Sequence, residues 1–202
     1  MTSANMLARV RTLLDEASAS YWTDAECYSA LSDGQREVVN IIYQRDRQSQ
    51  ILKTLWLELS DDNVSNQDIA VPDDFKEFIN ATMSTTLGGT KYTCKIVDYN
   101  PAYLRDQENT YLVASARNPS VYIKSSTTLG RLICFEPSSS DSRYTIIYMT
   151  QPTEISASVQ PLLPADAQEA IIIYAFSFLL RKDERPEADT VYKIFLDMVG
   201  KL

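Results

Sequence analysis

The chain has 202 residues, a formal net charge of −8 and an isoelectric point near 4.6. A protein that binds nucleic acid on its own normally needs a basic surface to neutralise phosphates, so the acidic balance argues against that class. Hydrophobic residues make up 45% of the chain and charged residues 23%, which excludes global disorder. The acidic residues form no run, so they serve solubility or make a surface along which DNA passes without binding.

Histidine, the side chain most used for proton transfer near neutral pH and for metal binding, is absent. The three cysteines, Cys27, Cys94 and Cys134, contain no C-x-x-C pair and cannot complete a four-ligand zinc site by themselves. An odd and sparse set of thiols fits a reducing cytoplasm better than a disulfide framework. We therefore expect no metal and no cofactor, and we expect each cysteine to be a small core or surface residue.

Residues 1–50 predict two amphipathic helices. The first has Ser3 as its candidate N-cap, followed by one apolar stripe at helical spacing: Met6, Val10, Leu13, Leu14 and Ala17. The second begins at a capping box, Thr23 with Glu26, and Trp22 stands where a hydrophobic staple residue would stand. It continues past Gly34, which either permits a close helix crossing or is a tolerated surface glycine.

The middle of the chain, residues 51–159, has the two-residue period of β-strands. Leu55, Leu57 and Leu59 alternate, and further strands are predicted at 91–97, 120–124, 131–136 and 143–149. The last three of these segments are predicted to be successive antiparallel strands. Phe75 and Phe78 lie in a short helical or extended stretch, and a short helix is predicted near 102–107. Five or six strands of this kind would form a small sheet or sandwich.

The third helix is predicted to begin at Pro164, and the fourth near Arg185. Residues 171–180 of the third helix are apolar on every side, so that helix must be covered all round. Either a neighbouring subunit covers part of it, or it is buried between the other helices and the β insert. At about half the length that a bilayer requires, this apolar run is a buried helix and no membrane anchor. The residues that we expect at a subunit interface are Ile171, Ile173, Tyr174, Phe176 and Phe178.

No motif with catalytic or ligand-binding chemistry stands out. The Gly88-Gly89 segment lacks the spacing and the following Lys-Ser/Thr of a phosphate loop. The acidic pairs Asp61-Asp62 and Asp73-Asp74 lack the spacing of a calcium loop, which favours solvated turns. We expect no signal peptide, because the first residues lack a basic start and an apolar stretch. The sequence therefore predicts a protein that is not an enzyme.

The predicted fold is α+β. A discontinuous helical bundle is built from residues 1–50 and 160–202, and an antiparallel β subdomain, residues 51–159, is inserted between its halves. The residues expected in the bundle core are Leu13, Leu31, Val38, Ile172 and Phe195.

The two ends resemble a known family at several segments. These are 8–17 (ARVRTLLDEA), 21–26 (YWTDAE), 31–38 (LSDGQREV) and 163–171 (LPADAQEAI), with weaker agreement at 179–183 and 185–188. In order and spacing they resemble the head-tail connector (adaptor) proteins of tailed bacteriophages. The long β middle is similar to the insertions of larger adaptors.

This resemblance implies a structural protein without catalytic residues. It implies a ring, commonly of twelve copies, that docks under the portal, extends the DNA channel and offers a surface to neck or tail proteins. Its place would be the neck of the virion, after synthesis in the host cytoplasm, and DNA would pass through without specific binding. Carboxylates that could line the channel are Asp61, Asp62, Asp73, Asp74, Asp106 and Glu108.

Two other readings remain open. One is a phage-encoded binding module whose β subdomain recognises a protein or a glycan, with the helices as its mount. The other is a hydrolase that uses Asp, Glu and Tyr side chains, which would show a deep acidic pocket. The mass of the native particle separates the ring adaptor from the binding module, since a ring of about a dozen subunits differs from a monomer or a trimer.

Overall fold

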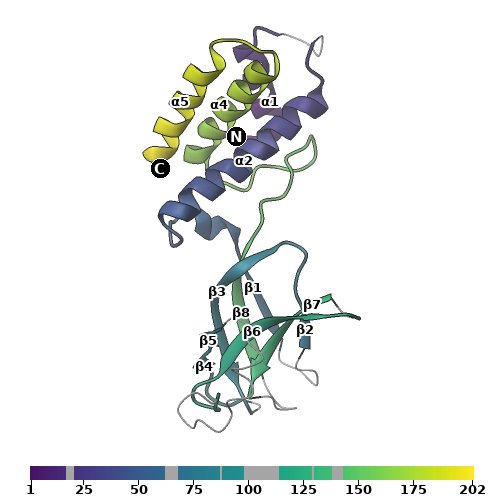
Figure 1. Cartoon of the computed structure of the whole chain (residues 1–202), viewed down its shortest axis with the longest axis vertical. Coiled ribbons are helices and arrows are strands. Elements are labelled where there is room, and N and C mark those ends of the chain that lie inside the picture. Colours follow the sequence, from purple (N-terminus) through teal and green to yellow (C-terminus); the bar gives the residue numbers. More distant parts are fainter. Residues whose placement is uncertain (17–20, 62–67, 87, 98–113, 129, 138–142) are drawn as a thin grey trace. The chain divides into compact units, whose positions relative to one another are not determined.

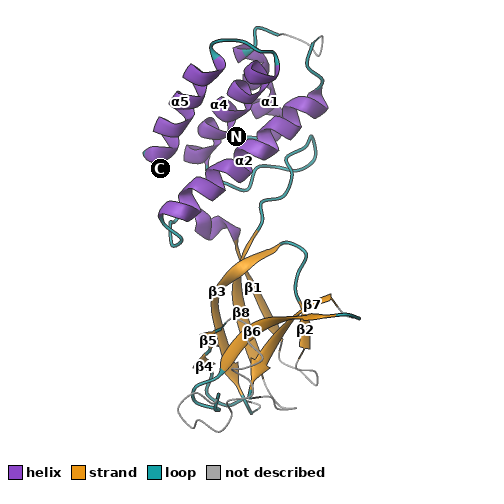
Figure 2. Cartoon of the chain, in the orientation of Figure 1, coloured by secondary structure: helices purple, strands orange, loops and turns teal. Residues whose placement is uncertain are grey.

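A computed structural model shows a chain that divides into two compact units. The first unit combines Met1–Leu55 with Gln151–Leu202, and the second is Trp56–Thr150. Helices come from both ends of the chain and strands from its middle, which confirms the predicted α+β fold with an inserted β unit (Figures 1 and 2). The structure describes residues 1–16, 21–61, 68–86, 88–97, 114–128, 130–137 and 143–202.

The first unit is a helical bundle with α4 at its centre. Its helices are α1 (Ser3–Leu13), α2 (Asp24–Arg45), α4 (Ala165–Lys182) and α5 (Ala188–Gly200), with a short 3-10 helix at Leu52–Leu55. Helix α4 contacts each of the other three helices. Four of the five residues predicted for the core are fully buried: Leu31, Val38, Ile172 and Phe195. Leu13, at the last position of α1, is half-buried.

The helix starts follow local capping chemistry. The predicted N-cap of α1 was one residue off: Thr2 is the cap, and its hydroxyl oxygen accepts a hydrogen bond from the Asn5 amide at 3.2 Å. Ser3 is instead the first helical residue, and its amide donates to Gln160 Oε1 at 2.8 Å. A hydroxyl at either position could cap the helix, and this long-range bond, which local sequence does not reveal, holds Ser3 inside it. At α2 the predicted capping box is present, with Thr23 and Glu26 each accepting from the other's amide.

Gly34 marks a close crossing of α2 and α4. A Cβ atom built at this glycine would lie 2.9 Å from the Ile171 carbonyl oxygen and 3.1 Å from Cδ1 of Tyr174. Both distances are shorter than ordinary van der Waals contact, so only a residue without a side chain fits here. Of the two interpretations of Gly34, the close helix crossing is therefore correct.

The second unit contains two four-stranded sheets. Their strand orders are β1-β8-β3-β4 and β2-β7-β6-β5, and every pair is antiparallel except the parallel pair of β5 and β6. The strands are β1 (Trp56–Asp61), β2 (Asp68–Ala70), β3 (Phe75–Ser84), β4 (Tyr92–Thr93), β5 (Lys95–Ile96), β6 (Ser120–Ser126), β7 (Gly130–Glu136) and β8 (Arg143–Thr150).

The segment around Phe75 and Phe78, predicted to be helical or extended, is extended: it forms the ten-residue strand β3. Two other strand predictions were wrong. The single strand predicted at 91–97 is two short strands that meet at Cys94 and belong to different sheets. The hairpin of β6 and β7 is present, but β8 does not extend it, because β8 lies between β1 and β3 in the other sheet. Alternation marks a strand but not its partner, since pairing is decided by distant residues. The helix predicted near 102–107 lies outside the described residues.

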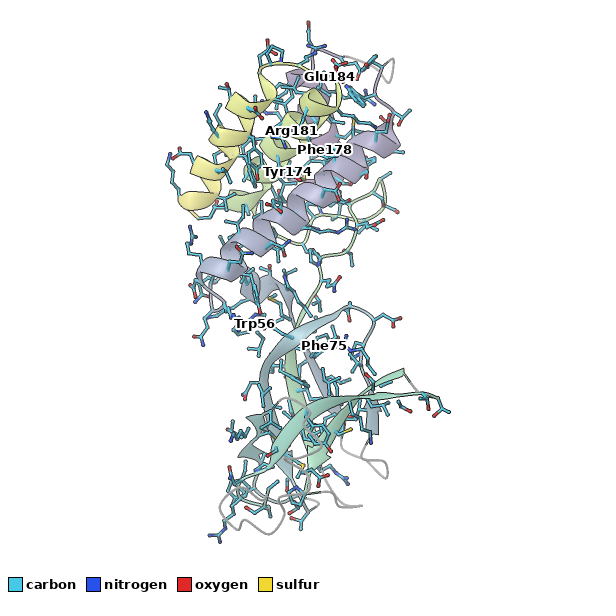
Figure 3. All side chains as sticks on the ribbon, in the orientation of Figure 1. Trp56, Phe75, Tyr174, Phe178, Arg181 and Glu184 are labelled. Atoms are coloured by element: carbon cyan, nitrogen blue, oxygen red, sulfur yellow. The ribbon has the colours of Figure 1, made fainter. Side chains whose placement is uncertain are left out.

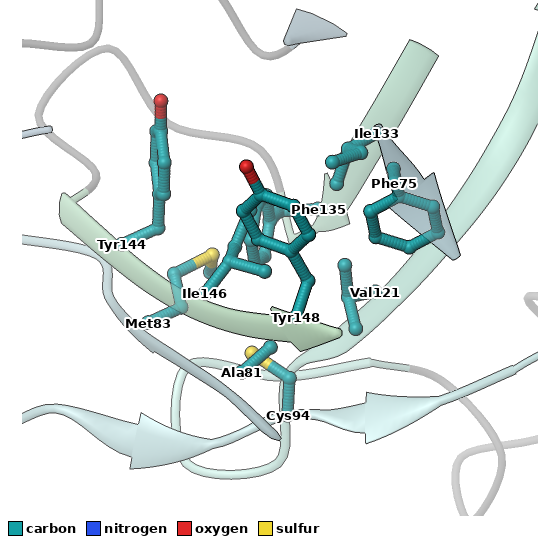
Figure 4. Packing of buried hydrophobic residues seen from close by; sticks show 10 residues of the cluster. All are labelled: Phe75, Ala81, Met83, Cys94, Val121, Ile133, Phe135, Tyr144, Ile146 and Tyr148. Atoms are coloured by element: carbon teal, nitrogen blue, oxygen red, sulfur yellow. The ribbon is translucent and has the colours of Figure 1, made fainter. Parts of the chain in front are cut away.

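The core of the second unit joins the two sheets. β3 and β8 contribute residues from one sheet, and β6 and β7 contribute residues from the other (Figure 4). Phe75 stacks on Tyr148 with ring centroids 5.5 Å apart, and Phe135 stacks on Tyr144 at 5.3 Å. Because the buried faces meet in one apolar cluster, the unit is a small sandwich. The residues of the cluster are Phe75, Ala81, Met83, Cys94, Val121, Ile133, Phe135, Tyr144, Ile146 and Tyr148.

Candidate assembly surface

Neither a metal-binding cluster nor a membrane-spanning helix is present among the described residues. No cluster of three or more Cys, Asp or Glu side chains there could hold a metal ion. None of its helices combines the length and the apolar character needed to span a bilayer. A groove of about 420 Å³ beside α2 is lined by polar side chains, but its cation, Arg36, is already paired with Asp33 at 3.0 Å and with Glu154 at 2.8 Å. The exposed surface of the bundle is therefore the stronger candidate for a functional site.

Aromatic side chains gather where α4, α5 and α2 meet. The ring of Tyr174 packs against Phe195 with centroids 5.2 Å apart, and it lies 6.3 Å from both Tyr192 and Phe178. Phe195 is fully buried, whereas Tyr174 and Tyr192 are half-buried and 38% of Phe178 is exposed. Tyr174, Phe178 and Arg181 follow one another along one side of α4 (Figure 3). This cluster thus runs from the core to the solvent.

We call Tyr174, Phe178, Tyr192 and Leu196 the aromatic face. Leu196 belongs to it because it lies one helical turn beyond Tyr192 on α5, and 43% of it is exposed. Large apolar side chains at the surface of a folded protein mark interaction sites when they are contiguous. The aromatic face has this character.

Charged groups surround the aromatic face. Burial raises the pKa of the Tyr174 hydroxyl, and the carboxylates of Glu37 and Asp33 on α2 raise it further. On the other side the Arg181 guanidinium lies 5.2 Å from the centre of the Tyr192 ring and pairs with Asp189 at 3.1 Å. An apolar centre with a polar rim is the usual composition of a protein–protein contact.

The five residues predicted for the subunit interface differ in their exposure to solvent. Ile171 is fully buried, and its carbonyl oxygen lies at the Gly34 crossing, so its side chain has no surface for a partner. Ile173, Tyr174 and Phe176 are half-buried, and Phe178 is exposed. Neighbouring helices cover much of α4, which accounts for part of its apolar circumference without any other subunit.

The predicted channel-lining carboxylates are not gathered into one site among the described residues. Asp73 is exposed, and the half-buried Asp74 accepts a hydrogen bond from the Tyr148 hydroxyl at 3.4 Å. Asp61 is the last residue of β1, and only its backbone belongs to the described part of the structure. Asp62, Asp106 and Glu108 lie outside the described residues.

Two exposed residues of α5 were missed by the sequence analysis. Half of Ile194 and 43% of Leu196 are exposed, on either flank of the buried stripe formed by Ala188, Phe195 and Val199. A signal was present: a surface helix is expected to be polar at such flanking positions, and these two are aliphatic.

The chain thus combines a discontinuous bundle, whose exposed apolar side chains fit contacts with other proteins, with an inserted β sandwich. The family model of the SU10 adaptor protein matches residues 1–202, so the chain belongs to this family of bacteriophage adaptors. The match extends over the β insert as well as the helical ends, and it confirms the resemblance seen in the sequence. A comparison with curated proteins finds no match. The protein is accordingly a structural adaptor of a phage virion.

Proposed function

We propose that the protein forms a ring, of twelve copies, that docks under the portal at the head-tail junction. The ring extends the DNA channel and gives neck or tail proteins a surface for attachment. The protein acts in the neck of the virion, after synthesis in the host cytoplasm, and performs no catalysis. The observation that carries this proposal is the exposed apolar surface on α4 and α5 of a chain that belongs to an adaptor family.

Burial of this surface supplies a driving force for assembly. Phe178, Ile194 and Leu196 keep between 38% and 50% of their surface in water. Removing apolar surface from water contributes about 25 cal/mol per Å², so several such side chains per contact, repeated around a ring, favour association. In this proposal the bundle of residues 1–50 and 160–202 forms the ring, and the insert of residues 51–159 meets neighbouring virion proteins.

The acidic character of the chain suits a DNA channel. Each Lys or Arg contact to a phosphate releases counterions and adds affinity, which would hold DNA during its passage. A ring of chains that each carry a net charge of −8 repels the duplex from its walls and keeps it centred. Asp61, Asp62, Asp73, Asp74, Asp106 and Glu108 are the carboxylates that we propose for the channel.

Native mass spectrometry and electron microscopy of the purified protein, alone and mixed with its portal protein, test the proposal. We expect a ring of twelve copies, formed alone or on the portal. A protein that stays monomeric to trimeric in both samples would refute the ring and favour a binding module instead.

A titration with duplex DNA at about 0.1 M salt, where charges are screened beyond roughly 10 Å, tests the channel separately. We expect no measurable affinity. Salt-dependent micromolar binding would contradict a wall that repels DNA.

A further inference from the structure

Helix α4 carries two separate apolar strips on its surface. With 3.6 residues per turn, Tyr174 and Phe178 lie on one side, while Ile173 and Phe176 lie on a side rotated from it by roughly 150°. Tyr174 and Phe178 belong to the aromatic face, between α5 and α2. Glu169, one turn before Ile173, pairs with Arg9 of α1 at 3.6 Å, which places the second strip between α5 and α1.

Helix α5 repeats this division. Its buried stripe contains Phe195 and Val199, and Tyr192 on one flank of this stripe meets Tyr174 of the aromatic face. Val191, Ile194 and Met198 recur on the opposite flank at the spacing of one helical strip, and half of Ile194 is exposed. This flank lies on the side of α4 that carries Ile173 and Phe176. We call Ile173, Phe176, Val191, Ile194 and Met198 the aliphatic face, after its exposed residue.

We propose that the aromatic face of one copy binds the aliphatic face of the next copy. The inference rests on the proposed ring and names the two surfaces that make it. A symmetric dimer uses the same patch on both copies, so it would bury one of these faces and leave the other in water. A head-to-tail contact buries one face of each of two neighbouring copies, and in a closed ring both faces of every copy are buried.

The charges at the rims favour this pairing. Three carboxylates lie around the aromatic face: Asp33, which pairs with Arg36, Asp189, which pairs with Arg181, and Glu37. This rim is net negative, so two aromatic faces brought together would repel each other. The aliphatic face has a balanced rim, where Arg9, with 56% of its side chain exposed, pairs with Glu169 at 3.6 Å. Like charges across a contact disfavour it, so the rims favour an aromatic face on an aliphatic face over two aromatic faces together.

Two variants, each with one face blocked, test the pairing. Phe178→Asp places a carboxylate on the aromatic face, and Ile194→Asp places one on the aliphatic face. We expect each variant alone to lose assembly and remain monomeric. Mixed together they should form one-to-one heterodimers and nothing larger, because each variant retains the face that its partner needs.

Sedimentation equilibrium over the concentration range in which the wild type forms rings measures these masses. Homodimers of either single variant would overturn the head-to-tail contact, and so would a mixture that stays monomeric. If the wild type itself fails to assemble, alone and with the portal, the proposed ring fails. If the wild type assembles but the mixture does not pair, this inference alone fails.

Controls separate assembly from folding. Leu196→Asp blocks the aromatic face at a more exposed position than Phe178 and should behave as Phe178→Asp does in both samples. Ala4→Asp adds the same charge at an exposed position of α1, on a side rotated by roughly 140° from Arg9, and should assemble as the wild type does. Circular dichroism establishes that each variant retains its helices.

Discussion

Replacing Gly34 with alanine is expected to destabilise the helical bundle, although alanine is the better helix former. Helix propensity alone would favour the substitution by about 1 kcal/mol. Against this, the new Cβ would lie 2.9 Å from the Ile171 carbonyl oxygen, a backbone atom of α4 that cannot turn aside. Overpacking of this kind typically costs about 1–3 kcal/mol, and here α2 and α4 must move apart to relieve it. Because the contact is with a backbone atom, the cost should lie in the upper half of that range, about 2–3 kcal/mol, which leaves a net loss of roughly 1–2 kcal/mol.

Urea unfolding followed by circular dichroism at a helical wavelength measures this loss. With a denaturant slope of about 2 kcal/mol per molar urea, the midpoint should fall by roughly 0.5–1 M. Gly200→Ala is the matched control, because a Cβ at Gly200 has no neighbour within 4 Å and only propensity acts. That variant should be as stable as the wild type or slightly more stable. A Gly34→Ala midpoint equal to or above that of the wild type would refute the close-crossing argument.

Three further predictions concern capping, pH and thiol reactivity. Thr23→Ala removes the α2 cap and should lower the free energy of unfolding by about 1 kcal/mol in the same assay, with Thr23→Ser restoring most of it; an unchanged midpoint would contradict the capping role. Lys182, whose Nζ lies 2.9 Å from Glu26 Oε1, together with Thr23, lowers the pKa of Glu26 from 4.5 to about 2. The pKa of Glu26 is lower in the folded than in the unfolded protein. Glu26 therefore contributes stability above about pH 4.5 that is lost as the pH falls to about 2. Glu26→Gln should flatten this part of the stability profile, and parallel profiles would exclude the contribution. Burial raises the pKa of Cys94 to about 12, and Cys27 and Cys134 are buried too. A thiol reagent at pH 8 should therefore react slowly with the native protein, whereas all three thiols should react once the protein is unfolded. A fast-reacting thiol in the native protein would contradict this.

The features that could be predicted from the sequence are those decided by neighbours along the chain. The Thr23–Glu26 box is such a feature, since both partners lie within one helical turn. The burial of Leu31 and Ile172 followed from helical periodicity in the same way. The position of β8 between β1 and β3 did not, because a strand shows the same alternation whichever strand it pairs with.

The candidate surface was predicted only in part, for a related reason. Periodicity showed that α4 needs cover on all sides, but not which side its own helices already cover. Ile171 therefore counted as an interface residue until its full burial inside the bundle was known. Ile194 and Leu196 were missed because the apolar stripe of α5 explained the helix without them.

The register of β1 and β8 ties the folding of one unit to that of the other. Trp56 pairs with Met149, so the chain enters and leaves the β unit at hydrogen-bonded neighbours whose Cα atoms are about 5 Å apart. While the sandwich is folded, the two halves of the bundle are joined as if by a short turn. Without it they are joined by a loop of roughly 100 residues, whose closure costs on the order of 3 kcal/mol more by the logarithmic law for flexible chains. A substitution in the sandwich core that unfolds the sandwich therefore weakens the bundle without touching any of its residues, because it lengthens the loop that the bundle has to close.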